Sequence, residues 1–287
     1  AGKLVRSRLQ LLAVSPVLRR QFLAKRGFDR LDERCDRIRS GQQETLVFDG
    51  LGLLPRFIGG LDVAGMREQT PAPILPSGNL HSLNRILQLS PLELARQLTY
   101  HDYAVYRSVR PSEFLKKQPR AALDALTARF NATEAFAASQ ILLTRQLRQR
   151  VLVICRLIDS ARACKALDNY LSCFAITTAL VKTTVSRLTH TFELLPQDYR
   201  DSLAELERLI QPPWLEYQRV LRYVAAPAVP YTGPFESKLA AIEANMESFD
   251  EGLLDVSKFE AISKEISAVL RWQTAPVYAI QPVTMVE

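Results

Sequence analysis

The stretch PAVPYTGPFESKLAAIEANM, residues 227–246, is the most informative part of this chain. Its prolines and Gly233 end any preceding helix, because proline lacks a backbone donor and glycine relaxes the backbone. Helical spacings of four, three and four residues then join the apolar side chains of Phe235, Leu239, Ile242 and Met246. The stretch predicts a helix that begins abruptly after a rigid collar, either as one more core helix or as an arm that reaches a partner.

The rest of the chain carries helical patterns and no strand pattern of useful length. No glycine occurs between Gly78 and Gly233, as a helical body requires. Ser90 is expected to cap a helix that starts at Pro91, with Glu93 closing a capping box. Apolar stripes are expected at Leu123, Leu126, Phe130 and Ala137; at Leu143, Leu147, Val151, Cys155 and Ile158; at Tyr170, Phe174, Ile176 and Leu180; and at Phe259, Ile262, Ile266 and Val269. The fold class is predicted to be all-α and multi-helical.

A proline-rich segment, TPAPILPSG at residues 70–78, reads as an extended linker. It separates a basic N-terminal segment, helical in part (1–75), from a helical domain (76–287). The net charge of +7 lies entirely in residues 1–40, which hold eleven Lys and Arg against four Asp and Glu. Such a leader predicts attraction to an acidic surface, either an anionic membrane or an acidic protein, unless it is only a solvated helix face. Nucleic acid is not an expected partner, since no aromatic platform or finger motif accompanies the charge.

Several classes of protein are excluded by what the sequence lacks. No apolar run approaches the ~20 residues of a membrane-spanning helix, and no secretory signal opens the chain, so a cytoplasmic location is expected, with recruitment to membranes as an addition. The widely spaced cysteines are expected to be core thiols. Three histidines without a metal-ligand spacing predict no metal site, and no cofactor is expected. Without a reactive cluster, the chain is predicted to bind rather than to make bonds.

Six segments in order resemble the catalytic domain of Ras-family guanine nucleotide exchange factors (RasGEF domain). They are SPLELARQLT (90–99) with YRSVRPSEFL (106–115), ARFN (128–131), LDNY (167–170), RLTHTF (187–192), PAVPYTG (227–233) and a closing helix over 257–276. The resemblance implies a helical domain with a protruding helical hairpin that performs no covalent chemistry. It also implies that the hairpin wedges open the first switch loop of a small GTPase while the body holds the second.

Carried over position by position, the resemblance implies two groups of site residues. The wedge on the hairpin would be formed by Leu239, Ala240, Glu243 and Ala244. The contact surface for the GTPase would be formed by Arg129, Asn131, Thr178, Val181, Phe235 and Lys238. Three positions depart from the family pattern: the family usually has a larger aliphatic at Ala240, glutamate at Ala244 and asparagine at Val181.

Two functions follow from this comparison. The first is a guanine nucleotide exchange factor that promotes GDP release from a Ras-like small GTPase, with Glu243→Ala or Leu239→Ala slowing that release. The second, motivated by Ala240, Ala244 and Val181, is a scaffold of the same fold that grips a GTPase or another helical partner without releasing nucleotide. Neither is an enzyme in the sense of covalent catalysis.

Overall fold

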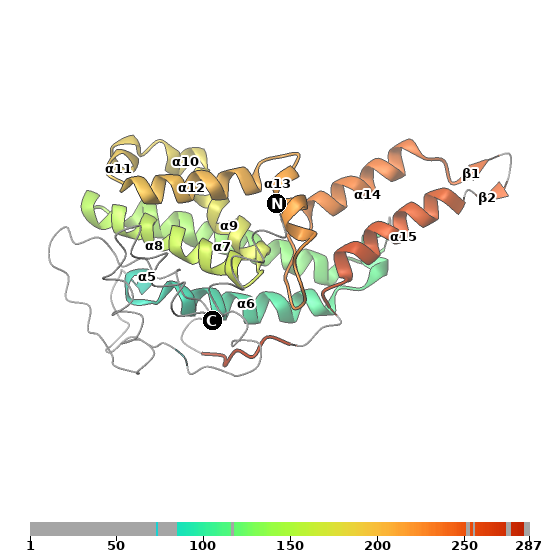
Figure 1. Cartoon of the computed structure of the whole chain (residues 1–287), viewed down its shortest axis with the longest axis horizontal. Helices are drawn as coiled ribbons and strands as arrows, with labels where there is room; N and C mark the ends of the chain where they lie inside the picture. Colours follow the sequence, from blue (N-terminus) through green and yellow to red (C-terminus); the bar gives the residue numbers. More distant parts are fainter. Residues whose placement is uncertain are drawn as a thin grey trace, which may run out of the picture. The chain divides into compact units, whose positions relative to one another are not determined.

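The described part of the chain is built almost wholly from α-helices, as predicted (Figure 1). The computed structural model describes residues 73, 85–115, 118–250, 253–254, 256–273 and 277–283. The basic leader and the predicted boundary after residue 75 lie outside these residues, so both stay predictions.

The described elements form a helical body followed by a helical hairpin. The body contains α5 (Arg85–Gln88), α6 (Pro91–Ser108), the 3₁₀ turn η1 (Pro111–Phe114), α7 (Ala121–Leu143), α8 (Leu147–Ala166), α9 (Tyr170–Val181), α10 (Thr183–Ser186), α11 (Thr189–Glu193), α12 (Gln197–Ile210) and α13 (Leu215–Leu221). The hairpin contains α14 (Gly233–Asn245), β1 (Phe249–Asp250), β2 (Leu253–Leu254) and α15 (Val256–Leu270).

Helix α9 forms the centre of the body because it is apolar on nearly every side. It packs against α7 on one side and α8 on another, and α6 packs in turn on α8. Phe174 is 2% exposed and Leu180 fully buried, and only Thr178 and Val181 among its residues reach the surface in part. A helix that is hydrophobic all round must be enclosed by other helices, which fixes the layered arrangement.

The predicted start of α6 is confirmed at Pro91, but the predicted cap is wrong. The Ser90 side chain makes no capping hydrogen bond. Glu93 is buried and accepts hydrogen bonds from Arg96 at 3.2 Å and Gln97 at 2.7 Å. Gln97 also donates to the Gln281 carbonyl, so this network attaches the C-terminal segment to α6. A buried carboxylate needs hydrogen-bond donors from the protein, because burial without them costs free energy. Glu93 therefore accepts from Arg96 and Gln97 instead of closing a capping box.

Two predicted apolar stripes are partly wrong. The stripe from Leu143 to Ile158 crosses a break, because α7 ends at Leu143 and α8 begins at Leu147; these two side chains are 76% and 38% exposed. Phe259 on α15 is 44% exposed, although Ile262 further along the same helix is buried. Periodicity gives the angle of a side chain about its helix, but it does not show where the covering helix stops.

The described cysteines are free and buried, as predicted. Burial raises the pKa of Cys155 and of Cys173 to about 12, so both thiols stay protonated at neutral pH. Among the described helices, none combines the length and the apolar character that a bilayer crossing would require.

Candidate functional site

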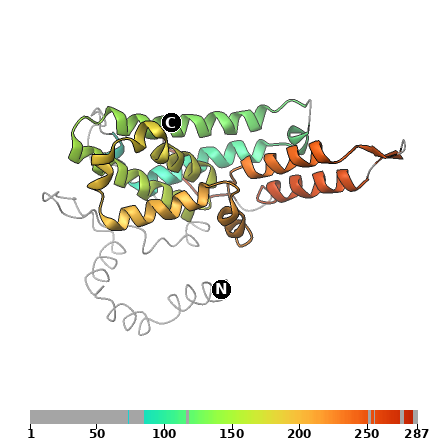
Figure 2. The ribbon, with the colours of Figure 1, turned by 90° about the horizontal axis from the view of Figure 1, so that it is seen from above.

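The helical hairpin is the most distinctive feature of the described residues. Helices α14 and α15 run side by side and extend away from the body in two perpendicular views (Figures 1 and 2). Strands β1 and β2 join them, with Phe249 opposite Leu254. The seam between the two helices contains Leu239, Ile262 and Ile266, with Phe114, Ile242 and Leu270 packed around them. Phe114 belongs to η1, so the body braces one side of the hairpin.

The collar before α14 is held by aromatic stacking. The Tyr231 ring lies 4.6 Å from that of Phe174 and 5.5 Å from that of Phe130, measured between centroids. The buried Tyr217 hydroxyl accepts from the Tyr231 amide at 2.7 Å and donates to its carbonyl at 3.2 Å. A Cβ at Gly233 would come within 2.7 Å of the Tyr231 ring, which explains glycine at this point. The collar therefore sets the direction in which α14 leaves the body.

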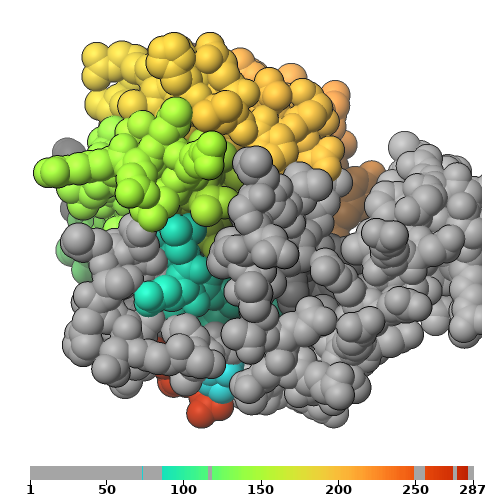
Figure 3. Space-filling view, turned by 90° about the vertical axis from the view of Figure 1, so that its left-hand side faces the viewer, coloured from blue at the N-terminus to red at the C-terminus, as the bar shows by residue number. Residues whose placement is uncertain are grey.

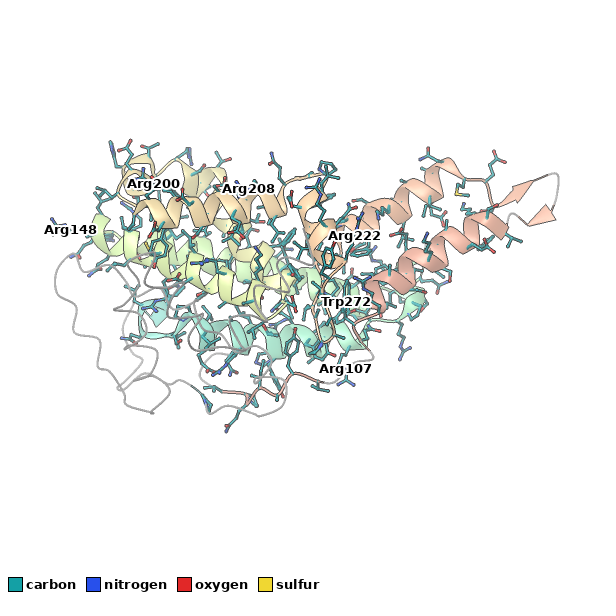
Figure 4. All side chains as sticks on the ribbon, viewed as in Figure 1. Arg107, Arg148, Arg200, Arg208, Arg222 and Trp272 are labelled. Atoms are coloured by element: carbon teal, nitrogen blue, oxygen red, sulfur yellow. The ribbon has the colours of Figure 1, made fainter. Side chains whose placement is uncertain are left out.

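The base of α15 is anchored independently. Trp272 lies at this base (Figure 4). Its indole donates to the Val224 carbonyl at 3.2 Å, and the Arg271 guanidinium lies 4.1 Å from the centre of its ring. Tyr106 of α6 donates its hydroxyl to the Val269 carbonyl at 2.8 Å. Because both helices are fixed where they leave the body, the hairpin is a stiff projection rather than a loose loop.

Helix α14 has an inward and an outward face, and the predicted wedge residues divide between them. Leu239 is 5% exposed and Phe235 9%, so both belong to packed interior. Ala240 and Ala244 are exposed one helical turn apart and share the outward face. The remaining exposed residues of α14 are Ser237, Lys238, Ala241 and Asn245. The outward face thus consists of small side chains with one cation.

Glu243, predicted as the acidic residue of the wedge, pairs within the hairpin. Its Oε2 lies 3.4 Å from Nζ of Lys258 on α15. Lys258 is 4% exposed and also donates to the Met246 carbonyl at 2.9 Å and to the Ser248 hydroxyl at 3.0 Å. The lysine therefore ties the end of α14 and the following turn to the start of α15.

Lys238 pairs across the hairpin as well, though more loosely. Its Nζ lies 3.6 Å from Glu265 Oε2, with the lysine side chain 47% exposed. An ion pair of this exposure contributes about 0–1 kcal/mol. Lys238 can exchange this contact for another at little cost, whereas Lys258 cannot.

Arg129, predicted to contact a GTPase, is the visible end of a buried polar network. Its Nε donates to Asp102 Oδ1 at 2.6 Å, while Asp102 is fully buried. The other carboxylate oxygen accepts from Asn169 at 2.9 Å and from the Ser172 hydroxyl. Asn169 caps α9 by accepting from the Ser172 amide. With 29% of its side chain exposed, Arg129 keeps one edge at the surface.

Three other predicted contact residues lie on the two helices next to this network. Asn131 is exposed on α7, while Thr178 and Val181 are half-buried at the end of α9. An ion pair of 2.7 Å between Lys182 and Glu134 links these two helices. Asn131, Thr178 and Val181 therefore lie on neighbouring helices, and their role as a contact surface stays a prediction.

Three charged residues that position the site could not be identified from sequence patterns: Asp102, Glu113 and Lys258. Each is a charged residue that is buried and holds elements together. Glu113 and Lys258 fall inside segments that resemble the family, and Asp102 lies between two such segments, so only the resemblance could have pointed to them. Periodicity could not identify them, since a charge on a helix is ordinarily predicted to face water.

Glu113 fixes η1, and through Phe114 it braces the hairpin. Its carboxylate accepts from the backbone amides of Arg110 at 3.1 Å, Ala122 at 2.8 Å and Leu123 at 3.1 Å. Burial acts to raise the pKa of Glu113, but these amides and the Arg110 charge outweigh it and lower the pKa below its ordinary value. The charged form is therefore the stabilising one.

Glu113→Gln is expected to lower the free energy of unfolding at pH 7 by about 1–3 kcal/mol, because an amide cannot accept all three bonds. A lowered folded-state pKa gives stability that is present above the unfolded-state pKa of about 4.3 and lost as pH falls through the folded value. The difference from wild type should shrink below about pH 5. Urea denaturation across this pH range measures it, with the exposed Glu260→Gln as control. A difference that is independent of pH would contradict the assignment.

A comparison with protein families decides the class of this chain. The RasGEF domain matches residues 93–260, which is more than half of the chain and includes the collar, α14 and the start of α15. The chain belongs to the RasGEF domain family. The resemblance predicted from the six segments is thereby confirmed, and the all-α fold agrees with it.

Known relatives of this RasGEF domain are exchange factors of two named groups. Ras guanine nucleotide exchange factor A of Dictyostelium discoideum is 30% identical over 237 residues, covering 77% of this chain and 39% of that protein. Rap guanine nucleotide exchange factor of Caenorhabditis elegans is 28% identical over 217 residues, covering 72% of this chain and 15% of that protein. Human Rap guanine nucleotide exchange factor 6 is 28% identical over 201 residues, covering 66% of this chain and 13% of that protein. The chain therefore spans well under half the length of these relatives.

Proposed function

We propose that this chain is a guanine nucleotide exchange factor for a Ras-like small GTPase and promotes GDP release through its hairpin. The observation that carries the proposal is the braced hairpin, whose outward face presents Ala240 and Ala244. Membership of the RasGEF domain family and the names of the relatives support it.

The proposed mechanism is linkage rather than covalent chemistry. A protein that binds the nucleotide-free GTPase more tightly than the loaded form weakens nucleotide affinity by the same ratio. The elements to be displaced are switch loops held by phosphate and magnesium, and magnesium tolerates little distortion of its octahedral ligands. A stiff hairpin suits this task, because a flexible one would bend instead of displacing its partner.

The small outward face gives the proposal a sharp test. Ala240→Arg and Ala244→Arg should each lower the acceleration of GDP release by about tenfold or more, since a large side chain would separate packed surfaces. Release of labelled GDP is measured on a panel of Ras and Rap proteins, the two groups named among the relatives. Ala204→Arg, an exposed alanine of α12, is the matched control. Absence of acceleration by wild type across the panel would overturn the proposal.

The substitutions first suggested by the sequence test something different. Leu239→Ala is expected to slow release by loosening the seam between α14 and α15, because Leu239 is part of that seam. Glu243→Ala is expected to slow release as well, because it removes the carboxylate that pairs with the buried Lys258 and so weakens the contact between α14 and α15. Both variants therefore report on the stiffness of the hairpin and not on direct contact with the GTPase.

A second candidate is a scaffold that binds a GTPase or another helical partner without releasing nucleotide. Alanines at the wedge positions, Val181 on α9 and the engagement of Glu243 by Lys258 favour it. A stable complex that leaves GDP release unchanged would identify this alternative.

Attraction of the basic residues 1–40 to an anionic membrane remains a separate proposal. It is carried by their charge alone. Charge reversal within them should weaken binding to anionic vesicles, and unaltered binding would contradict it.

A further inference from the structure

The turn between α7 and α8, residues 142–148, combines exposed leucines with arginines. Leu143 is 76% exposed, the highest value among the large apolar side chains of the described residues, and Leu142 is 47% exposed. Arg145 and Arg148 follow these leucines, and both are exposed on either side of the exposed Leu147. Large aliphatic side chains gathered in this way indicate a contact surface rather than chance exposure.

The turn lies at the end of the body opposite the hairpin. Figure 4 shows Arg148 at that extremity, far from Arg222 and Trp272 at the base of the hairpin. Figure 3 views this end directly and shows the yellow-green surface of α8 beside the gold surface of α10–α12. Arg150 donates to the Thr191 hydroxyl at 3.1 Å, which fixes α11 against α8. Leu194, 54% exposed just after α11, adds a further leucine to this end.

The charge of the surrounding chain selects an anionic occupant. Residues 135–158 contain four arginines and no acidic residue; Arg145 and Arg148 are exposed, while Arg150 and Arg156 are half-buried and donate to the Thr191 hydroxyl and the Leu87 carbonyl. Glu193 of α11, whose side chain is 70% exposed, lies 3.4 Å from His190 Nδ1 and forms an ion pair with it only when that histidine is protonated.

We propose that the α7–α8 turn is a membrane contact that inserts Leu142 and Leu143 at the boundary between headgroups and acyl chains of an anionic bilayer. Leucine side chains at such a depth gain apolar burial, while arginines remain at the level of the lipid phosphates. The turn lies at the extremity of the body, beside Arg148, so a bilayer can reach it (Figure 4). The contact would leave the hairpin at the far end accessible. It depends neither on exchange activity nor on the leader.

The test is co-flotation of the full chain with phosphatidylcholine vesicles containing about 30% phosphatidylserine. Leu143→Ser and Arg148→Glu should each lower the partition coefficient by about tenfold. The matched controls are Leu215→Ser, at a leucine that is 59% exposed on α13, and Arg222→Glu, which makes the same change of charge at the hairpin base. Because the leader is the same in all four variants, the ratio of the partition coefficients of a turn variant and its control measures the contribution of the turn alone.

Each outcome decides the proposal. Weaker binding of the two turn variants than of their controls supports it, provided that thermal melts show all four proteins folded. Equal binding within both pairs overturns it, and capture by an acidic protein would then be the remaining use of this surface. A loss for Arg148→Glu without a loss for Leu143→Ser would overturn the insertion of the leucines, since surface attraction alone needs no apolar contact.

Discussion

Asp102→Ala is expected to lower the free energy of unfolding by about 3–5 kcal/mol, the largest effect of any substitution considered for this chain. The carboxylate is fully buried and receives hydrogen bonds from Arg129, Asn169 and Ser172. Its loss leaves a buried amide, a buried hydroxyl and a partly exposed guanidinium without their acceptor. Each unsatisfied buried donor costs about 1–3 kcal/mol.

The same network connects helices that lie far apart in the sequence, so its loss should destabilise more than one of them. Asp102 lies on α6, Arg129 on α7 and Asn169 at the cap of α9. The Tyr170 amide next to the cap donates to Val229 of the collar at 2.8 Å. Asp102→Ala is therefore expected to loosen the base of the hairpin as well as the body.

Urea denaturation followed by circular dichroism measures this effect. Asp124→Ala, whose side chain is 73% exposed on α7, is the matched control and should change stability by less than about 0.5 kcal/mol. A loss below about 1 kcal/mol for Asp102→Ala would show that the network does not stabilise the body in this way.

Lys258→Met should lower stability by about 2–3 kcal/mol, concentrated in the hairpin. Methionine keeps most of the length but removes three contacts: the pair with Glu243 and the bonds to Met246 and Ser248. Glu243 retains 24% exposure, so it can be partly rehydrated, which places the loss below that for Asp102. The end of α14 should then fray from α15.

Hydrogen exchange of the α14 amides and urea denaturation together measure this change. Lys264→Met on the same helix is the control, because Lys264 is exposed. The double variant Lys258→Met with Glu243→Gln should be less destabilised than the sum of the single variants, since both partners of one ion pair are removed. Equal protection of α14 in the Lys258 and Lys264 variants would contradict the role of the lysine as a clamp.

If the hairpin acts as a rigid wedge, the same variant should also slow GDP release. The reason is mechanical: a frayed α14 would present Ala240 and Ala244 in many orientations. Retained acceleration with a frayed hairpin would separate the clamp from the proposed function.

The collar and the inward face of α14 could be predicted from local patterns. The prolines and Gly233 marked the collar, and the spacing of Leu239 and Ile242 marked the inward face of α14. Arg129 and Glu243, predicted to face a partner, contact Asp102 and Lys258 inside the protein, and their role toward a partner stays a prediction. A family resemblance predicts which residue occupies a position, but it does not predict which neighbouring side chains that residue contacts.

The sequence by itself determined the all-α class, the collar and the family, because helical periodicity, proline and glycine act within a few residues of themselves. Only the tertiary structure decided which charges are buried, which leucines are exposed at the α7–α8 turn and which face of α14 points outward. Those properties depend on contacts between residues far apart in the chain. Asp102 and Asn169 illustrate the difference: 67 positions separate them, and only folding brings their polar atoms within hydrogen-bonding distance.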